Sequence, residues 1–153
     1  MKNNKSFSLE ELLPVMLEQF DAGKKITFKP RGTSMLPLLR EGQDSIVLEK
    51  SRGNHKKNDI VFYRRKDGQF VLHRIVYTND GYVISGDHQR FFEYGITDDD
   101  IIGIATGFYR GEKYYSVNNI FYKIYTLFIR LRRNIKISPL GHFLGKIIHR
   151  KKG

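Results

Sequence analysis

Apolar residues near the start of the chain recur at the spacing of a helix. The repeating positions are Leu9, Leu12, Leu13, Met16 and Phe20. Ser8 precedes them and Glu11 follows three residues later, which is the capping-box pattern of a helix N-terminus. Gly23 interrupts the pattern. The spacing therefore predicts an amphipathic helix of about four turns between Ser8 and Gly23.

Short runs rich in β-branched and aromatic residues follow, separated by Gly, Asn and Asp. The six runs that we predict as strands are Ile26–Phe28, Ser45–Leu48, Asp59–Tyr63, Gln69–Tyr77, Tyr82–Ser85 and Ile102–Tyr109. This spacing predicts a mainly β fold, a compact and strongly bent antiparallel sheet or barrel.

Helical spacing returns in the last part of the chain, in two amphipathic stretches. The first has one apolar face and one basic or polar face: Phe121, Ile124, Phe128, Leu131 and Ile135 against Lys123, Thr126, Arg130 and Arg133. The second begins at Ser138 and Pro139, a cap and first-turn pair. The sequence thus predicts C-terminal amphipathic helices after the sheet.

Charge divides the chain unevenly. The sequence has 27 Lys or Arg and 16 Asp or Glu, a net charge of +11. Ten of the basic residues and none of the acidic ones lie in 113–153, which leaves 17 against 16 in the rest. We therefore predict an N-terminal helix at 1–24, a nearly neutral β-rich domain at 25–112 and a basic helical tail at 113–153.

Several chemistries are excluded by composition. The absence of cysteine excludes disulfides, thiolate nucleophiles and cysteine-ligated zinc. Covalent catalysis would therefore need Ser, Thr, Lys or a carboxylate, and we expect no cofactor and no metal. Neither a secretory signal nor an apolar run of the roughly 18 residues needed to cross a bilayer is present, so we expect no membrane span.

Three residues attract attention, although each also has an ordinary structural explanation. Ser34 follows a predicted strand and a glycine, where backbone N–H groups could stabilise an oxyanion, but a serine there can equally cap a helix. His73 alternates with Val71 and Ile75 on one strand face, where a histidine is usually a hydrogen-bonded core residue. Asp87 follows the next strand, where an aspartate commonly forms a turn.

The order of four sequence blocks changes this picture. Gly-Thr-Ser-Met-Leu-Pro at 32–37 is followed by Asn-Asp-Ile-Val-Phe-Tyr at 58–63, Val-Leu-His-Arg-Ile-Val at 71–76 and Ser-Gly-Asp at 85–87. This order resembles the type I signal peptidases, which share a serine peptidase clan with LexA-like repressors. It is most similar to the branch in the endoplasmic reticulum, archaea and some Gram-positive bacteria, where histidine is the general base.

The resemblance implies roles for individual residues. Ser34 matches the nucleophile, His73 the general base and Asp87 the aspartate of the Gly-Asp motif, while Glu93 stands where that branch has a second acidic residue. Either carboxylate could orient His73, with a slight preference for Asp87. Gly32 departs from the pattern, because many relatives have a serine there that supplies an oxyanion donor, a role that backbone N–H groups or Thr33 would have to take over.

The resemblance also implies how a substrate would bind. In the family, an extended peptide lies between the strand before the serine and the strand of the base, which here are 26–31 and 69–73. The residues implied to contact it are Ile26, Phe28, Val71, Thr33 and Met35. The expected activity is endopeptidase cleavage of a peptide or leader-bearing protein after small residues.

Two other functions remain open. The chain could be a catalytically silent relative that only binds peptides, or a basic nucleic-acid-binding module, although the nearly neutral body and the lack of a nucleic-acid motif disfavour the latter. The tail either contacts an anionic membrane surface or packs on the β-rich domain. We expect a cytoplasmic location, with peripheral contact at the inner face of the membrane.

Overall fold

The described part of the chain is divided into two units. The computed structural model describes residues 8–137, the side chains of 134–137 excepted, so the second predicted helix of the tail lies outside the described residues. The division falls between Val117 and Asn118. The first unit contains helix α1 (Leu9–Asp21) and all the strands, and the second contains helix α2 (Ile120–Ile137). Within 8–137, neither helix is long and apolar enough to cross a bilayer.

Helix α1 begins with the predicted capping box. The Ser8 hydroxyl accepts a hydrogen bond from the Glu11 N–H at 3.2 Å, and the Glu11 carboxylate accepts one from the Ser8 N–H at 2.8 Å. Gly23, at a φ of 73°, follows the helix in the left-handed region that glycine tolerates best. Met16 and Phe20 are buried, as the spacing predicts, whereas Leu9 and Leu12 are each 37% exposed, so only the C-terminal part of the predicted apolar face is buried.

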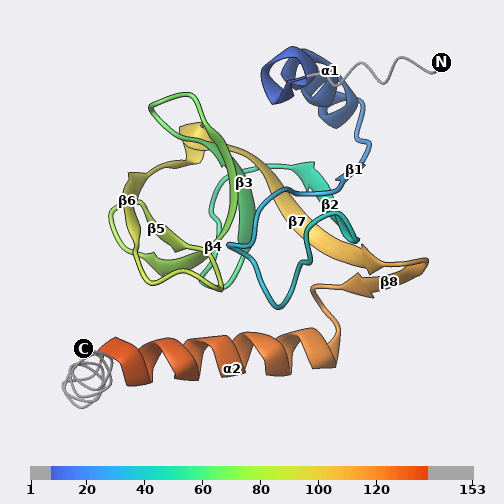
Figure 1. The fold of residues 1–153 in the computed structure, drawn as a ribbon. Helices are drawn as coiled ribbons and strands as arrows, with labels where there is room; N and C mark the ends of the chain where they lie inside the picture. The colour runs from blue at the N-terminus through green and yellow to red at the C-terminus, as the bar shows by residue number, and fades with distance from the viewer. Residues whose placement is uncertain (1–7, 138–153) are drawn as a thin grey trace, which may run out of the picture. The chain divides into compact units, whose positions relative to one another are not determined.

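Eight strands form one antiparallel sheet, drawn in Figure 1. Their bounds are β1 Ile26–Phe28, β2 Asp44–Lys50, β3 Ile60–Arg64, β4 Phe70–Thr78, β5 Tyr82–Ser85, β6 Glu93–Ile96, β7 Ile101–Arg110 and β8 Lys113–Ser116. The order across the sheet is β1-β2-β7-β3-β4-β5-β6, and β8 pairs with β7 as a hairpin. A mainly β antiparallel fold is therefore confirmed. No ladder among the described strands joins β1 to β6, so the sheet is open.

The six predicted strands are present within one or two residues of their expected ends, but β6 and β8 are absent from the prediction. β6 contains Gly95 at a φ of 73° and has little apolar alternation, so its sequence does not indicate a strand. β8 exists because Gly111, at a φ of 62°, turns the chain back onto β7. This hairpin places 113–117 with the β-rich unit.

A hydrophobic cluster lies between the central strands and the β5–β6 hairpin. Its buried members are Val61, Tyr63, Ile75, Tyr82, Ile84, Ile96 and Ile101, with Val71 packed against them. Because Val61 and Tyr63 pair with His73 and Val71 in the β3–β4 ladder, this cluster shares a sheet face with His73.

Candidate active site

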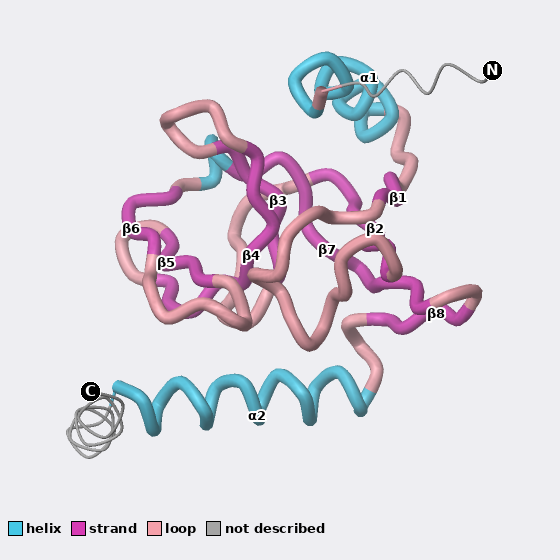
Figure 2. The backbone as a smooth tube through the Cα atoms, in the orientation of Figure 1, coloured by secondary structure: helices cyan, strands magenta, loops and turns pink. Residues whose placement is uncertain are grey.

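Ser34 lies in the long loop 29–43 between β1 and β2 (Figure 2). This loop is folded into turns, with the Leu36 N–H donating to the Thr33 carbonyl at 3.1 Å. Ser34 therefore does not cap any helix in the described part of the chain. Three side chains of the loop, those of Met35, Leu38 and Leu39, are buried, while Ser34 is half-buried.

The Ser34 backbone is held against the loop that follows β5. Its carbonyl accepts a hydrogen bond from the His88 N–H at 2.8 Å. A Cβ atom added to Gly86 would lie 2.5 Å from the Ser34 carbonyl oxygen and 3.0 Å from the Ser34 Cβ. Only glycine at position 86 leaves room for Ser34, which gives a physical reason for the glycine in the Ser-Gly-Asp block.

A buried carboxylate fixes the far end of the serine loop. Asp44, fully buried at the start of β2, accepts hydrogen bonds from the Arg40 guanidinium and from the Arg40 N–H. Arg110 of β7 also pairs with it at 3.3 Å. Hydrogen bonds from Arg40 hold the pKa of the Asp44 carboxyl well below its usual range. The end of the loop is thus tied to β2 and β7.

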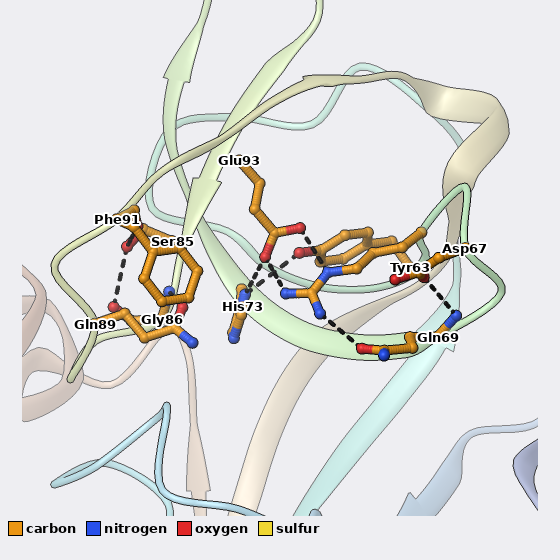
Figure 3. Close-up of polar contacts among 10 residues, drawn as sticks. Tyr63, Asp67, Gln69, His73, Ser85, Gly86, Gln89, Phe91 and Glu93 are labelled. Atoms are coloured by element: carbon orange, nitrogen blue, oxygen red, sulfur yellow. Dashed lines mark hydrogen bonds and ion pairs between the residues drawn. The ribbon is translucent and has the colours of Figure 1, made fainter.

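His73 lies in β4 opposite Val61 of β3, and its side chain is 2% exposed. Its Nδ1 atom is 3.3 Å from the Tyr63 hydroxyl and 3.4 Å from a Glu93 carboxylate oxygen. Figure 3 shows Glu93 and Tyr63 on the same side of the ring, with the other ring nitrogen pointing away from them. If Nδ1–H donates to Glu93, Nε2 is left with a lone pair that can accept a proton.

Glu93 of β6 is shared between His73 and Arg65. The Arg65 Nε atom donates to one Glu93 oxygen at 2.8 Å, and Arg65 Nη2 forms an ion pair with the other. Burial alone would raise the pKa of Glu93, but the hydrogen bonds from Arg65 and Tyr63 lower it more, so the net shift is downward. A carboxylate at this position is therefore ionised at neutral pH.

Burial governs the protonation of His73. Loss of hydration lowers the pKa of the imidazole to about 4, against an opposing effect of the Glu93 charge. His73 is therefore neutral at neutral pH and available as a base. The negative charge of Glu93 next to Nδ1 offsets part of the cost of forming a buried imidazolium.

Asp87 occupies a different position from the one expected. Its two oxygens accept hydrogen bonds from Arg74 Nε and Nη2, each at 2.7 Å, and both side chains are almost completely buried. Arg74 also donates to the Asn58 carbonyl at 2.9 Å. The slight preference for Asp87 as the carboxylate that orients His73 is therefore replaced by Glu93, because Asp87 is held by the residue next to the histidine.

The β4–β5 ladder brings the serine loop close to His73. Arg74 pairs with Ser85 in this antiparallel ladder. If the register continued by one residue, His73 would lie opposite Gly86, and Ser34 packs on Gly86. Among the described residues, no hydrogen bond joins the Ser34 hydroxyl to His73. Catalytic hydrogen bonds are often long without substrate and shorten when it binds.

The residues implied to contact substrate have mixed environments. Ile26, Phe28 and Val71 are half-buried and Thr33 is exposed, whereas Met35 is only 5% exposed and so has little side chain to offer a ligand. Contacts between aromatic rings connect β1, β3 and β4. The Phe62 ring lies 5.5 Å from that of Phe28 and 5.8 Å from that of Phe70.

Two strand edges are available beside these residues. Within the described chain, β1 pairs only with β2, so its other edge is free. Residues 70–73 of β4 pair with β3, while β5 pairs with β4 only from Arg74 onward. Both edges could add an extended segment of backbone.

A second serine–histidine contact lies elsewhere in the first unit. The Ser51 hydroxyl is 2.8 Å from His55 Nε2, and an Asp98 oxygen is 3.8 Å from the same nitrogen. In a catalytic triad the carboxylate instead contacts the nitrogen that does not face the serine. Because both oxygens approach Nε2, this group does not have the arrangement of a triad.

Tyr63 and Arg65 were not among the predicted site residues. Tyr63 lies at the end of β3 on the same sheet face as His73, and Arg65 follows two residues later. The alternation Val61, Tyr63, Arg65 across the hairpin from His73 could have indicated this face. What alternation could not indicate is that β6, an unpredicted strand, brings Glu93 to both residues.

Comparisons with models of protein families, with curated proteins and with solved structures found no match.

Proposed function

We propose that this protein is a serine endopeptidase of the signal-peptidase type, with Ser34 as nucleophile and His73 as general base. The observation that carries the proposal is the placement of Glu93 against His73 Nδ1, with Ser34 packed on the residue one ladder step from His73. A buried neutral imidazole, an ionised carboxylate behind it and a nearby serine are the components that activate a hydroxyl for attack on an amide.

The reaction would proceed in two stages. Ser34 Oγ attacks the scissile carbonyl while His73 Nε2 takes the hydroxyl proton, and the imidazolium then gives this proton to the leaving amine. Water next attacks the acyl-serine ester with the same histidine as base, which releases the carboxylate product and regenerates Ser34. Glu93 stabilises the imidazolium in both stages because it lies at the opposite ring nitrogen.

Backbone N–H groups could stabilise the oxyanion of each tetrahedral intermediate. Gly32 has no side-chain donor, and its own N–H already donates to Glu41 at 2.8 Å. In the described chain, the N–H groups of Ser34 and Met35 donate to no other residue. Two free donors at the nucleophile are the usual composition of an oxyanion hole.

The substrate would be an extended peptide. The free edges of β1 and of 70–73 in β4 supply backbone hydrogen-bonding groups, and the half-buried Ile26, Phe28 and Val71 lie on these strands. Strand addition binds a peptide through its main chain, and pockets beside alternate side chains give specificity. Preference for small side chains before the cleaved bond is the expectation from the family resemblance.

The test is cleavage of a mixture of unstructured peptides at pH 7.5, with cleavage sites mapped by mass spectrometry. Cleavage after small residues, lost in Ser34→Ala and in His73→Ala, is the expected result. Ser51→Ala is the matched control, because it removes the serine of the other serine–histidine contact and should leave cleavage unchanged.

Two outcomes would contradict the proposal. If Ser51→Ala abolishes cleavage and Ser34→Ala does not, the wrong serine has been assigned. If no variant and no wild-type preparation cleaves, while a peptide still binds with equal affinity to wild type and Ser34→Ala, the chain is a silent peptide-binding relative.

A further inference from the structure

Helix α2 has an apolar stripe that is exposed to solvent. Its members are Ile120, Phe121, Ile124, Leu127, Phe128 and Leu131. At about 100° per residue, these six side chains fall within an arc of about 120° of the helix surface. Phe121 is 74% exposed and Phe128 is 57% exposed, so both aromatic rings of the stripe are accessible to solvent. A continuous apolar stripe that is exposed to solvent indicates an interaction site.

The charge of α2 has a single sign. The helix contains five Lys or Arg and no Asp or Glu: Lys123, Arg130, Arg132, Arg133 and Lys136. By helical geometry, Lys123 and Arg130 border one side of the stripe and Arg132 borders the other. Cationic residues on both margins of an apolar face are typical of helices that lie in the plane of a membrane surface.

We propose that α2 binds the surface of an anionic lipid bilayer, with the stripe inserted among the acyl chains and the flanking basic residues against the headgroups. The apolar arc fits the acyl-chain region of the bilayer, and the basic margins of the arc fit its polar headgroup layer. The bordering cations Lys123, Arg130 and Arg132 fit a negative surface, to which each Lys or Arg near the headgroups adds favourable energy.

Charge also selects this partner over a second copy of the chain. Two α2 helices packed stripe to stripe would place cations from both copies along the same seam, with no carboxylate on either helix to pair with them. Duplex nucleic acid would satisfy the cations but would leave the six apolar side chains in water. A lipid surface satisfies both features.

The direct test is flotation of the full chain with vesicles of phosphatidylcholine and phosphatidylglycerol, compared with vesicles of phosphatidylcholine alone. We expect binding to the anionic vesicles that falls as salt rises, and little binding to the neutral ones. Phe128→Asp should lower partitioning by at least about tenfold. Phe91→Asp is its matched control, because Phe91 is 54% exposed against 57% for Phe128.

A second pair of variants tests the charge. Lys123→Gln/Arg130→Gln should weaken binding by about 30-fold, since each charge contributes about 1 kcal/mol at an anionic surface. Lys24→Gln/Lys25→Gln removes the same charge from exposed positions in the first unit and should have little effect. Equal losses in both double variants would show only a net-charge effect and overturn the assignment to α2.

Light scattering tests the remaining alternative, in which a second copy of the chain covers the stripe. A dimer that Phe128→Asp dissociates, together with vesicle binding that this variant leaves unchanged, would show that a second copy covers the stripe. A monomeric wild type whose vesicle binding is lost in Phe128→Asp supports the lipid surface. Each result is independent of peptidase activity, so the peptidase proposal and this one can fail separately.

Discussion

Two arginine–carboxylate pairs lie on either side of the candidate base, and they differ in burial and in what they contact. Arg74 and Asp87 have side chains 1% and 0% exposed, with two hydrogen bonds of 2.7 Å between them. Arg65 and Glu93 are 26% and 16% exposed, and Glu93 also reaches His73. The first pair joins β4 to the loop after β5. In the second, the carboxylate oxygen that pairs with Arg65 Nη2 also lies 3.4 Å from the imidazole Nδ1.

The residue types of the two pairs are nearly the same, and burial is the feature that distinguishes the pair to which we propose a functional role from the other. A fully buried pair is very costly to break, because the remaining charge has no solvent and no partner. A partly exposed pair can be changed at lower cost, and its charge still acts on a buried neighbour. We therefore assign Asp87 to holding the fold around Ser34 and Glu93 to the chemistry of His73.

The largest expected effect is on stability. Arg74→Met leaves the Asp87 carboxylate buried beside an apolar side chain, and we expect the free energy of unfolding to fall by about 3–5 kcal/mol. Urea denaturation measures the change. The control is Arg74→Met/Asp87→Leu, which removes both charges and should recover a large part of the loss. A cost below about 1 kcal/mol for the single variant would contradict the structural assignment.

Glu93→Gln should affect activity more than stability. We expect kcat/KM to fall about 100-fold, because the amide carries no charge to stabilise the imidazolium. Unfolding should change by only about 1 kcal/mol, since the pair with Arg65 is partly solvated. Peptide cleavage kinetics and urea denaturation on the same preparation measure both. An unchanged kcat/KM would remove Glu93 from the mechanism.

The pKa of His73 gives a pH dependence with a definite sign. The folded pKa of about 4 lies below the ordinary 6.5, so between these values the unfolded chain binds a proton that the folded chain does not. The contribution of His73 to stability is therefore lost as pH falls from 6.5 towards 4, with a slope approaching about 1.4 kcal/mol per pH unit. His73→Gln should flatten this part of the stability profile, and a parallel profile would contradict the buried neutral state.

The smallest effect is expected for a pair exposed on both sides. Lys50 and Asp21 are 51% and 65% exposed. Lys50→Ala should change the free energy of unfolding by no more than about 0.5 kcal/mol, because solvent screens the pair and its side-chain entropy is regained. A thermal melt beside Arg74→Met measures the contrast. A loss comparable to that of Arg74→Met would mean that burial is not what ranks these pairs.

The sequence predicts most of the secondary structure because the signals are local. The Ser8 capping box, the apolar spacing of α1 and the runs of β-branched residues depend only on neighbouring residues. β6 lacks such a signal, since Glu93-Tyr94-Gly95-Ile96 becomes a strand only through its pairing with β5.

The candidate site is likewise predictable from the sequence only in part. Ser34, His73, Asp87 and Glu93 can be selected by their order along the chain, but order does not say which carboxylate faces the imidazole. That choice depends on Arg74, whose side chain captures Asp87, and on β6, which carries Glu93 to His73. Both are long-range consequences of the fold, so the order of residues along the chain leaves the choice between Asp87 and Glu93 open.

The most direct test of the central claim is to trap the acyl-serine formed from an activated peptide ester. The wild-type protein is mixed with a p-nitrophenyl ester of a short peptide ending in alanine, quenched in acid and digested with trypsin. Cleavage after Arg31 and Arg40 yields the fragment 32–40, whose fragmentation spectrum distinguishes Ser34 from Thr33. We expect the acyl group to be transferred to Ser34 with release of p-nitrophenol, and no acyl group in Ser34→Ala. Acylation of another residue, or equal acylation of Ser34→Ala, would contradict it.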